Sequence, residues 1–206
     1  HQLYARVLLT DGDTSREAVE AYRKLLVVDP NNRGCLEMLN QYHQSQDIVD
    51  EEAEKVLLTL RELNPDKRDY MLQLCTLYLK TERLDDEAEL TFRKYLDHDS
   101  TNLPIREGLA RCLNGRQAWL EGLKECNAIL RMEPTRRTTL ELLVECYRRL
   151  EMFDEAAKRF RQLADKHPDQ AWFSALATSL GEESREHRKR VRAEKKEGED
   201  FAQYYN

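Results

Sequence analysis

The chain has 206 residues, of which 40% are hydrophobic and 35% are charged, and its formal net charge at pH 7 is −6. It holds only seven glycines and five prolines, which argues against a β sandwich or a disordered chain. No run of about 18 apolar residues is present, so no membrane span is expected. The acidic balance disfavours nucleic acid as a partner.

One short pattern recurs along the chain and predicts its helices. Leu3, Val7 and Leu9 indicate a first helix close to the start. After it, a glutamate followed by a small residue recurs every 34 or 35 residues. These pairs are Glu17-Ala18, Glu52-Ala53, Glu87-Ala88, Glu121-Gly122 and Glu155-Ala156. Four residues after each small residue comes an apolar or aromatic one: Tyr22, Leu57, Phe92, Cys126 and Phe160.

Each unit ends at a residue that predicts a turn and begins with a second set of regularly spaced, mostly apolar residues, called a ladder here. The turn is marked by Pro30, Pro65, Pro134 and Pro168, with Ser100 in the third unit. The ladders follow i, i+3, i+7 spacing, which is one helix face: Leu36, Leu39, His43; Met71, Leu74, Tyr78; Arg106, Leu109, Leu113; Leu140, Leu143, Tyr147. Each unit is therefore helix A, a turn, helix B and a second turn. Self-similarity at this period predicts an all-α solenoid of stacked helix pairs.

The predicted units cover residues 1–32, 33–67, 68–102, 103–136 and 137–170. Residues 171–180 are apolar at helical spacing and predict a capping helix, which Gly181 is expected to end. The solenoid then spans residues 1–180, and a charged helix or tail spans 181–206. Its basic run, residues 188–196, is interleaved with glutamates that favour intrahelical pairs. A nuclear-import patch and a nucleic-acid contact are the alternative interpretations.

The pattern resembles the tetratricopeptide repeat family. The likeness rests on a small residue, an aromatic and a proline, as in Ala156, Phe160 and Pro168, with Leu143 and Tyr147 upstream. It covers residues 2–168 and implies a right-handed superhelix that binds proteins. The sequence departs from the family at two kinds of position. The glycine usual in helix A is replaced by Asn40, Cys75, Ala110 and Val144, and the fourth unit carries Arg106, Gly122 and Cys126 at signature positions.

In this architecture helix A lines the inner, concave surface, and the helix A residues not used in the core predict a groove. Its predicted lining is Glu37, Gln41, Asp69, Leu72, Thr76, Leu79, Glu107, Arg111, Glu141, Glu145 and Arg148. The row is mostly acidic, so a basic or mixed-charge peptide or helix is the expected partner. An ordinary solvated helix face is the alternative. Some family members hold a peptide carboxylate with Lys and Asn at these positions, and here only Arg111 has a suitable charge, which disfavours that role.

No enzyme motif is present, and the chain is expected to be non-catalytic, with no cofactor and no metal site. The five cysteines show no CxxC and no zinc spacing, so they are predicted to be small core residues in a reducing, cytoplasmic compartment.

Two other functions stay open. The basic C-terminal segment predicts an association with nucleic acid, and exposed solenoid ends predict a homo-oligomer.

Overall fold

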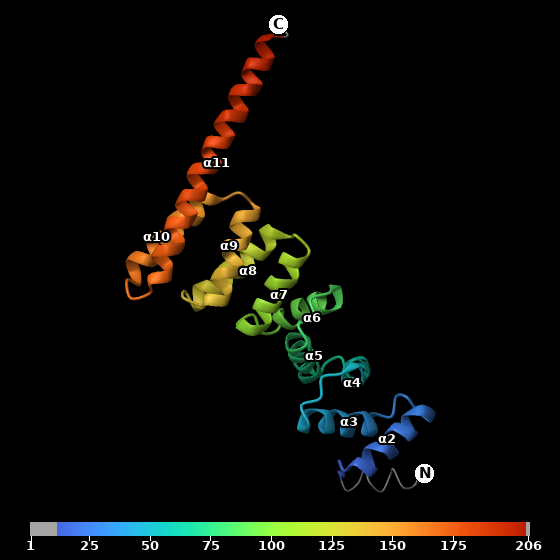
Figure 1. Cartoon of the computed structure of the whole chain (residues 1–206). Helices are drawn as coiled ribbons and strands as arrows, with labels where there is room; N and C mark the ends of the chain where they lie inside the picture. Colours follow the sequence, from blue (N-terminus) through green and yellow to red (C-terminus); the bar gives the residue numbers. More distant parts are fainter. Residues whose placement is uncertain (1–11, 205–206) are drawn as a thin grey trace. The chain divides into compact units, whose positions relative to one another are not determined.

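The computed structural model describes the backbone of residues 12–204 and the side chains of residues 12–196. Every regular element in the described range is an α-helix (Figure 1). The helices are α2 (Arg16–Val28), α3 (Arg33–Ser45), α4 (Glu51–Leu63), α5 (Arg68–Lys80), α6 (Asp86–Leu96), α7 (Leu103–Gly115), α8 (Trp119–Met132), α9 (Arg137–Arg149), α10 (Phe153–Lys166) and α11 (Ala171–Tyr204). The expected first helix with Leu3, Val7 and Leu9 lies outside the described residues.

The chain divides into two compact units, of which the first ends at Cys112 and the second begins at Leu113. In the first unit α2 packs on α3, α3 on α4, α4 on α5 and α5 on α6. In the second unit α8 packs on α9, α9 on α10 and α10 on α11. The prediction of an all-α solenoid built from helix pairs is therefore confirmed. Helices α3, α5, α7 and α9 are the A helices, and α2, α4, α6, α8 and α10 are the B helices.

The recurring small and aromatic residues form the core, which explains their spacing. Ala18, Ala88 and Ala156 are fully buried, as is the aromatic one turn further on in the same helix. A small side chain lets the neighbouring helix approach closely, and the aromatic then fills the space beside it. All five cysteines are free and buried, as predicted for small core residues.

The acidic residues before the B helices hold the helix starts. Asp50 and Asp85 are the N-caps of α4 and α6, and their Oδ1 atoms accept hydrogen bonds from the N–H groups of Ala53 and Ala88, both at 2.9 Å. The recurrent glutamate lies in the first turn of the helix and has a further role. The carboxylates of Glu52 and Glu87 accept hydrogen bonds from an arginine on the preceding B helix, Arg23 and Arg61 respectively. They therefore tie consecutive B helices together.

The Asp85 cap predicts a pH-dependent stability. Burial opposes ionisation of Asp85, but the hydrogen bond from the Ala88 N–H and the ion pair with Arg83 outweigh it, so the pKa of this carboxyl is lowered. A lowered folded-state pKa stabilises the fold above the ordinary aspartate pKa, and this stabilisation is lost as the pH falls below it. We expect Asp85→Ala to cost about 1 kcal/mol at neutral pH.

Asp85→Asn is the matched control, because asparagine caps as well as aspartate but does not titrate. In urea unfolding followed by circular dichroism, the stability gap between wild type and Asp85→Ala should narrow as the pH falls below about 4. The gap between wild type and Asp85→Asn should stay small at neutral pH. An unchanged gap for Asp85→Ala at acidic pH would contradict the role of the ionised cap.

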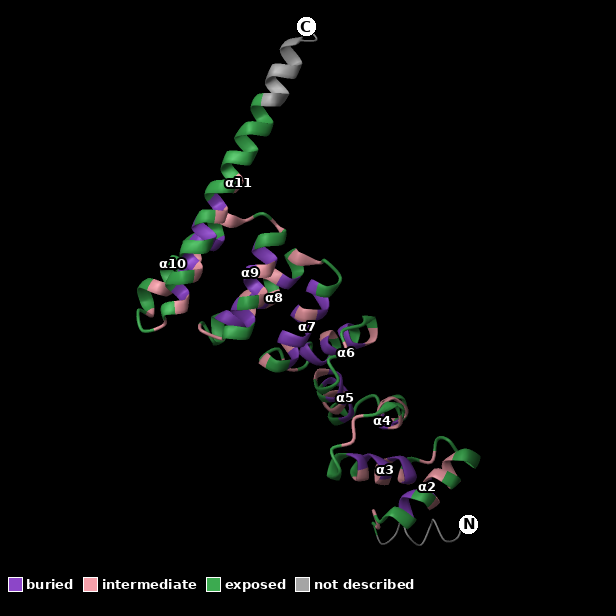
Figure 2. Ribbon diagram, viewed as in Figure 1, coloured by how far each residue is buried: buried purple, intermediate pink, exposed green. Residues whose placement is uncertain are grey.

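The C-terminal helix differs from the prediction, because Gly181 does not end it. Helix α11 continues through Gly181 to Tyr204. Phe173, Ala177 and Leu180 are buried where α11 packs on α10, and Ser184, one turn beyond Leu180, is buried as well. This packing and the charged helix formers that follow outweigh the cost of one helical glycine, about 1 kcal/mol. Figure 2 shows the change from buried to exposed residues along α11.

Candidate peptide-binding surface

A hollow of about 270 Å³ lies in the first unit, where α3 and α5 run beside the start of α4. Leu72 and Thr76, both predicted to face the groove, line it on α5. Its remaining lining is Asn40, His43, Gln44, Asp47, Ile48, Val49, Ala53, Leu57, Gln73, Leu77 and Lys80. Two of the predicted residues therefore line a concave feature whose buried part is mixed, with Leu57 and Leu77 beside Asn40 and His43.

Two polar contacts hold α3 and α5 at the hollow. The Asn40 side-chain amide donates to Gln73 Oε1 at 2.8 Å. Lys80, the last residue of α5, forms an ion pair with Asp47, which follows α3. Asn40 is buried, so its polar group needs this partner. These contacts keep the two A helices at a fixed spacing, so the hollow is preformed.

Glu37 is committed to a network at one end of α3 and α5. Its Oε1 accepts from Arg33 Nε at 3.0 Å and from the Tyr70 hydroxyl at 2.9 Å, and Lys67 Nζ donates to the same hydroxyl at 2.9 Å. Burial opposes ionisation of Glu37, but the hydrogen bonds from Arg33 and Tyr70 outweigh it and lower its pKa. The carboxylate is therefore ionised and already neutralised by cations of this chain.

The other predicted residues of α3 and α5 lie near the surface. Gln41 and Asp69 are exposed, and Leu79 is half-buried. Leu79 packs close to Gly108 on α7, since a Cβ atom added to Gly108 would lie 2.6 Å from Leu79 Cδ2. Gln41 and Asp69 are thus available to a partner, whereas Leu79 is partly used in packing.

Glu107 differs from the expectation that it faces the groove. Only 6% of the residue is exposed, and Arg111 Nη2 lies 3.6 Å from its Oε1. Arg111 is half-buried, one turn further along α7. A partner at this position would therefore meet the arginine, because the glutamate is covered. The i, i+3, i+7 ladder had placed Glu107 one position away from the core, and the helix turns it inwards.

In the second unit the three predicted residues lie on α9 and are all paired. Glu141 accepts from Arg137 Nε at 3.0 Å, and Glu145 accepts from Arg149 Nε at 2.7 Å. Arg148 donates to both carboxylate oxygens of Glu183 on α11, at 2.7 and 2.9 Å. These hydrogen bonds from Arg148 lower the pKa of Glu183. This ion pair links α9 to α11.

The predicted acidic stripe is thus largely neutralised by arginines of the same helices. Each of Glu37, Glu107, Glu141 and Glu145 has an arginine four residues away in contact, so Asp69 is the acid without a described partner. Sequence reasoning missed Asn40 and Gln73 as a pair. A signal existed, since Asn40 is a polar residue at a position that the repeat pattern assigns to close helix packing.

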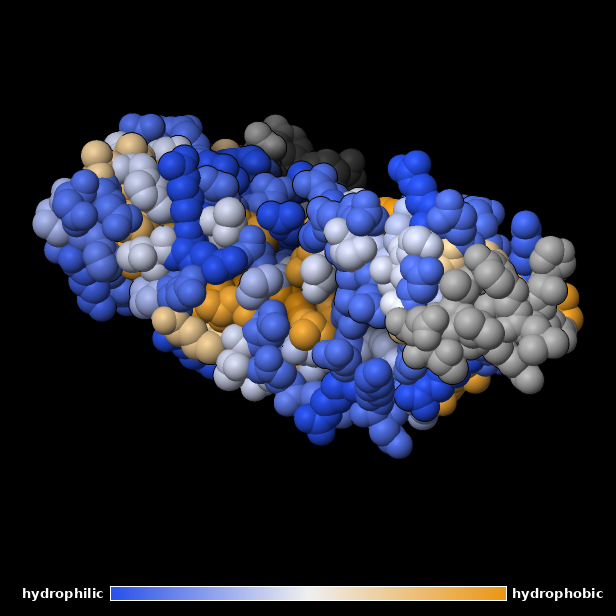
Figure 3. All heavy atoms as spheres, turned by 90° about the horizontal axis from the view of Figure 1, so that it is seen from below, coloured by the Kyte–Doolittle hydropathy of each residue, from blue (hydrophilic) through white to orange (hydrophobic). Residues whose placement is uncertain are grey.

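Neither a membrane-spanning helix nor a metal site is found among the described residues. They contain no helix long and apolar enough to cross a membrane. No group of three or more potential metal ligands gathers within the same range. In the view of Figure 3 the face is mainly hydrophilic, and apolar residues form separate patches within it. Such patches on a charged surface are candidates for partner contact.

Comparison with known proteins gives matches at the level of structure. No protein-family model matches the sequence, and no curated protein matches it. A crystal structure of MamA aligns with 81% of this chain and 90% of its own, at 17% identity and a TM-score of 0.56. MamA from Desulfovibrio magneticus RS-1 aligns with 82% of this chain and 94% of its own, at 14% identity and a TM-score of 0.54.

YrrB, described as a TPR protein with an unusual peptide-binding site, aligns with 87% of this chain and 89% of its own. Its identity is 17% and its TM-score is 0.58. At such identities the likeness concerns the fold, and the repeat spacing and helix pairs described above agree with it. The chain therefore has the fold of a tetratricopeptide repeat protein.

Proposed function

We propose that this protein is a non-catalytic interaction scaffold that binds a peptide or helix of a partner protein on its A helices. The observation that carries the proposal is the hollow between α3 and α5. It combines half-buried Leu72 with exposed polar groups on a preformed pair of helices. A hollow that combines apolar and polar lining residues suits one side chain of a partner, which would anchor the bound segment.

The charges on the A helices determine what charge the partner is expected to carry. In the first unit, Gln41, Asp69 and Arg111 extend the proposed surface from the hollow, and in the second unit the proposed contacts are Glu141, Glu145 and Arg148 on α9. Because most of these charges are already paired, a partner of mixed charge fits better than a strongly basic one. Exchange of Glu141 or Glu145 should change the association rate and its salt dependence more than the affinity.

A charge placed in the hollow tests the proposal. We expect Leu72→Lys to weaken partner binding by roughly tenfold or more, because it removes an apolar contact and buries a cation. The measurement is affinity purification with quantitative mass spectrometry, followed by titration of the recovered partner. The matched control is Leu63→Lys, on a B helix with 39% of the residue exposed. If partners still bind Leu72→Lys but no longer bind Leu63→Lys, the binding site is not on the A helices.

A second candidate function is nucleic-acid association through α11. Arg185, Arg192 and Lys196 lie on one face of this helix and have no ion pair among the described residues. The neighbouring cations are paired, as in Lys189 with Glu186 at 2.7 Å and Arg190 with Glu151 at 2.6 Å. Salt-dependent binding of RNA that is lost with Arg185→Glu and Arg192→Glu together would favour this function over the scaffold.

A further inference from the structure

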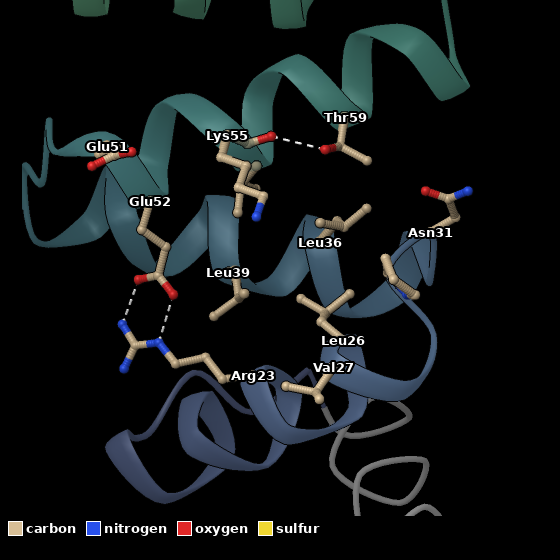
Figure 4. A pocket seen from close by; sticks show the side chains of 12 residues that line it. Arg23, Leu26, Val27, Asn31, Leu36, Leu39, Glu51, Glu52, Lys55 and Thr59 are labelled. Atoms are coloured by element: carbon tan, nitrogen blue, oxygen red, sulfur yellow. Dashed lines mark hydrogen bonds and ion pairs between the residues drawn. The ribbon is translucent and has the colours of Figure 1, made fainter.

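A second and larger hollow, of about 720 Å³, lies on the other side of the first unit, between the B helices α2 and α4. Its floor is formed by Leu36 and Leu39 of α3, and Leu26, Val27 and Val56 extend its apolar lining. Figure 4 shows the leucines of α3 between the two outer helices. This hollow and the A-helix hollow have no lining residue in common, although α3 and α4 contribute residues to both.

The open end of the hollow carries exposed apolar residues. Val27, which lines the hollow, is 83% exposed, and Pro30 beside it is exposed as well. The opposite end is closed by Arg23 of α2, which donates to both carboxylate oxygens of Glu52 on α4, at 2.7 and 2.6 Å. The trough is therefore closed by an ion pair at one end and apolar at the other.

The next repeat supplies an internal comparison. Residues 35 positions later in the chain occupy the same places, as Ala18 and Ala53 do. Leu26 and Val27 thus correspond to Arg61 and Glu62. Arg61 reaches across from α4 to α6, where it donates to Glu87 at 3.2 Å and to Thr91 at 3.4 Å. Leucine and valine cannot form such a bridge, so the trough between α2 and α4 stays open and apolar.

One cation faces the trough without a partner. Lys55 extends from α4 toward the space above the leucines of α3, while Glu51 points away from it (Figure 4). Lys55 has no ion pair among the described residues, and its counterpart in the next repeat is Leu90, an apolar residue. A carboxylate on the occupant would therefore complement the one unpaired charge that overhangs the apolar floor.

We propose that this trough docks an amphipathic α-helix of a partner protein, with its apolar face on half-buried Leu26 and exposed Val27, above the buried floor of Leu36 and Leu39, and an acidic side chain on Lys55. The trough walls are helices whose backbone groups are bonded within the helix. An extended peptide lying on the apolar floor would leave its own N–H and C=O groups without partners, whereas a helix satisfies them internally. The site is separate from the A-helix surface, so either proposal can fail alone.

The probe is a capped, fluorescein-labelled, alanine-based peptide of about 14 residues with leucines at i, i+3, i+4 and i+7 and one glutamate beside them. A control peptide has the same composition with the leucines spread around the helix. Fluorescence anisotropy should show saturable binding of the first peptide alone. Equal binding of both peptides, or no saturable binding, would overturn the proposal.

Three variants locate the binding. The double variant Leu26→Arg, Val27→Glu gives the trough the residues found at these positions in the next repeat. It should weaken peptide binding by about tenfold or more. Leu90→Lys, which places a lysine at the Lys55 position of the neighbouring cleft, should leave binding unchanged. Lys55→Glu should weaken binding of the glutamate peptide and strengthen binding of a version that carries lysine instead. Circular dichroism checks that each variant folds.

Two further outcomes count against the proposal. If Leu72→Lys abolishes binding and the Leu26→Arg, Val27→Glu variant does not, the peptide binds the A-helix surface. If wild-type protein forms a dimer in sedimentation experiments, and the same double variant is monomeric, the occupant of the trough is a second copy of this chain.

Discussion

Replacing Gly122 with alanine is expected to destabilise the second unit by about 1–3 kcal/mol. This runs against helix propensity, which favours alanine over glycine by about 1 kcal/mol inside a helix. The reason is the side chain of Asn114, which occupies the space that the alanine methyl group needs. A Cβ atom at position 122 would lie 2.1 Å from Asn114 Oδ1 and 3.4 Å from Cys146 Sγ.

Asn114 cannot easily move aside. It is buried, and its Oδ1 accepts a hydrogen bond from the Cys146 thiol at 3.1 Å. A rotation would break this contact inside the core, where unpaired polar groups are costly. The other four repeats carry alanine at the Gly122 position, so glycine is used here to admit the asparagine.

The test is urea unfolding of Gly122→Ala beside two comparisons. Gly115→Ala is the matched control, since nothing lies within 4 Å of a Cβ atom at that position, and its stability should change by less than about 1 kcal/mol. Asn114→Ala combined with Gly122→Ala should be more stable than the sum of the two single changes predicts. If the two effects are additive, or if Gly122→Ala is as stable as wild type, then the close contact between position 122 and Asn114 does not contribute to stability.

Replacing Phe92 with alanine is expected to cost about 3–5 kcal/mol, the largest effect of any single change considered. Phe92 is fully buried in α6. Its ring meets the edge of Tyr78, with the centroids 6.4 Å apart and the planes at 80°. A Cβ atom at Gly108 would lie 3.1 Å from the Phe92 ring, so α7 also packs against it closely. Truncation would leave a cavity that three helices border.

Cys126→Ala is the comparison, because Cys126 occupies the position of Phe92 in the fourth repeat and is also fully buried. Only one heavy atom is lost, so the cost should be about 0.5–1.5 kcal/mol, as for other small truncations. Guanidinium unfolding of both variants gives the two values. Since the chain has two compact units, each transition is fitted separately if two appear. Similar costs for both variants would contradict a core in which the repeat aromatics carry the packing energy.

Much of the fold could be predicted from the sequence because the packing repeats. Ala53 and Ala88 recur since each B helix needs one point of close approach, and Asp50 and Asp85 recur since each caps the start of its own B helix. Gly181 was interpreted wrongly for a related reason. A glycine ends a helix only where the chain leaves it, and here Leu180 and Ser184 remain packed on both sides of it.

The candidate site was less predictable, because ion pairs between side chains on the same helix face determine which charges are available to a partner. The acidic residues could be placed on the A helices, but their neutralisation by arginines four residues away depends on rotamers. Glu107 is buried although it lies next to the predicted core positions of α7, and periodicity alone does not resolve a difference of one position. The trough between α2 and α4 arises from a contrast between Leu26 and Arg61, which is visible in the sequence only once the repeats are superimposed.

The most direct test of the scaffold proposal is site-specific photocrosslinking in cells that express the protein with its partners. Thr76 on α5 and Leu90 on α6 would each be replaced by p-benzoylphenylalanine in separate proteins. Thr76 is exposed at the A-helix hollow, and Leu90 is 46% exposed on a B helix. We predict that a defined partner segment crosslinks to position 76 and that Leu72→Lys abolishes this product. Crosslinks at position 90 alone would contradict binding on the A helices.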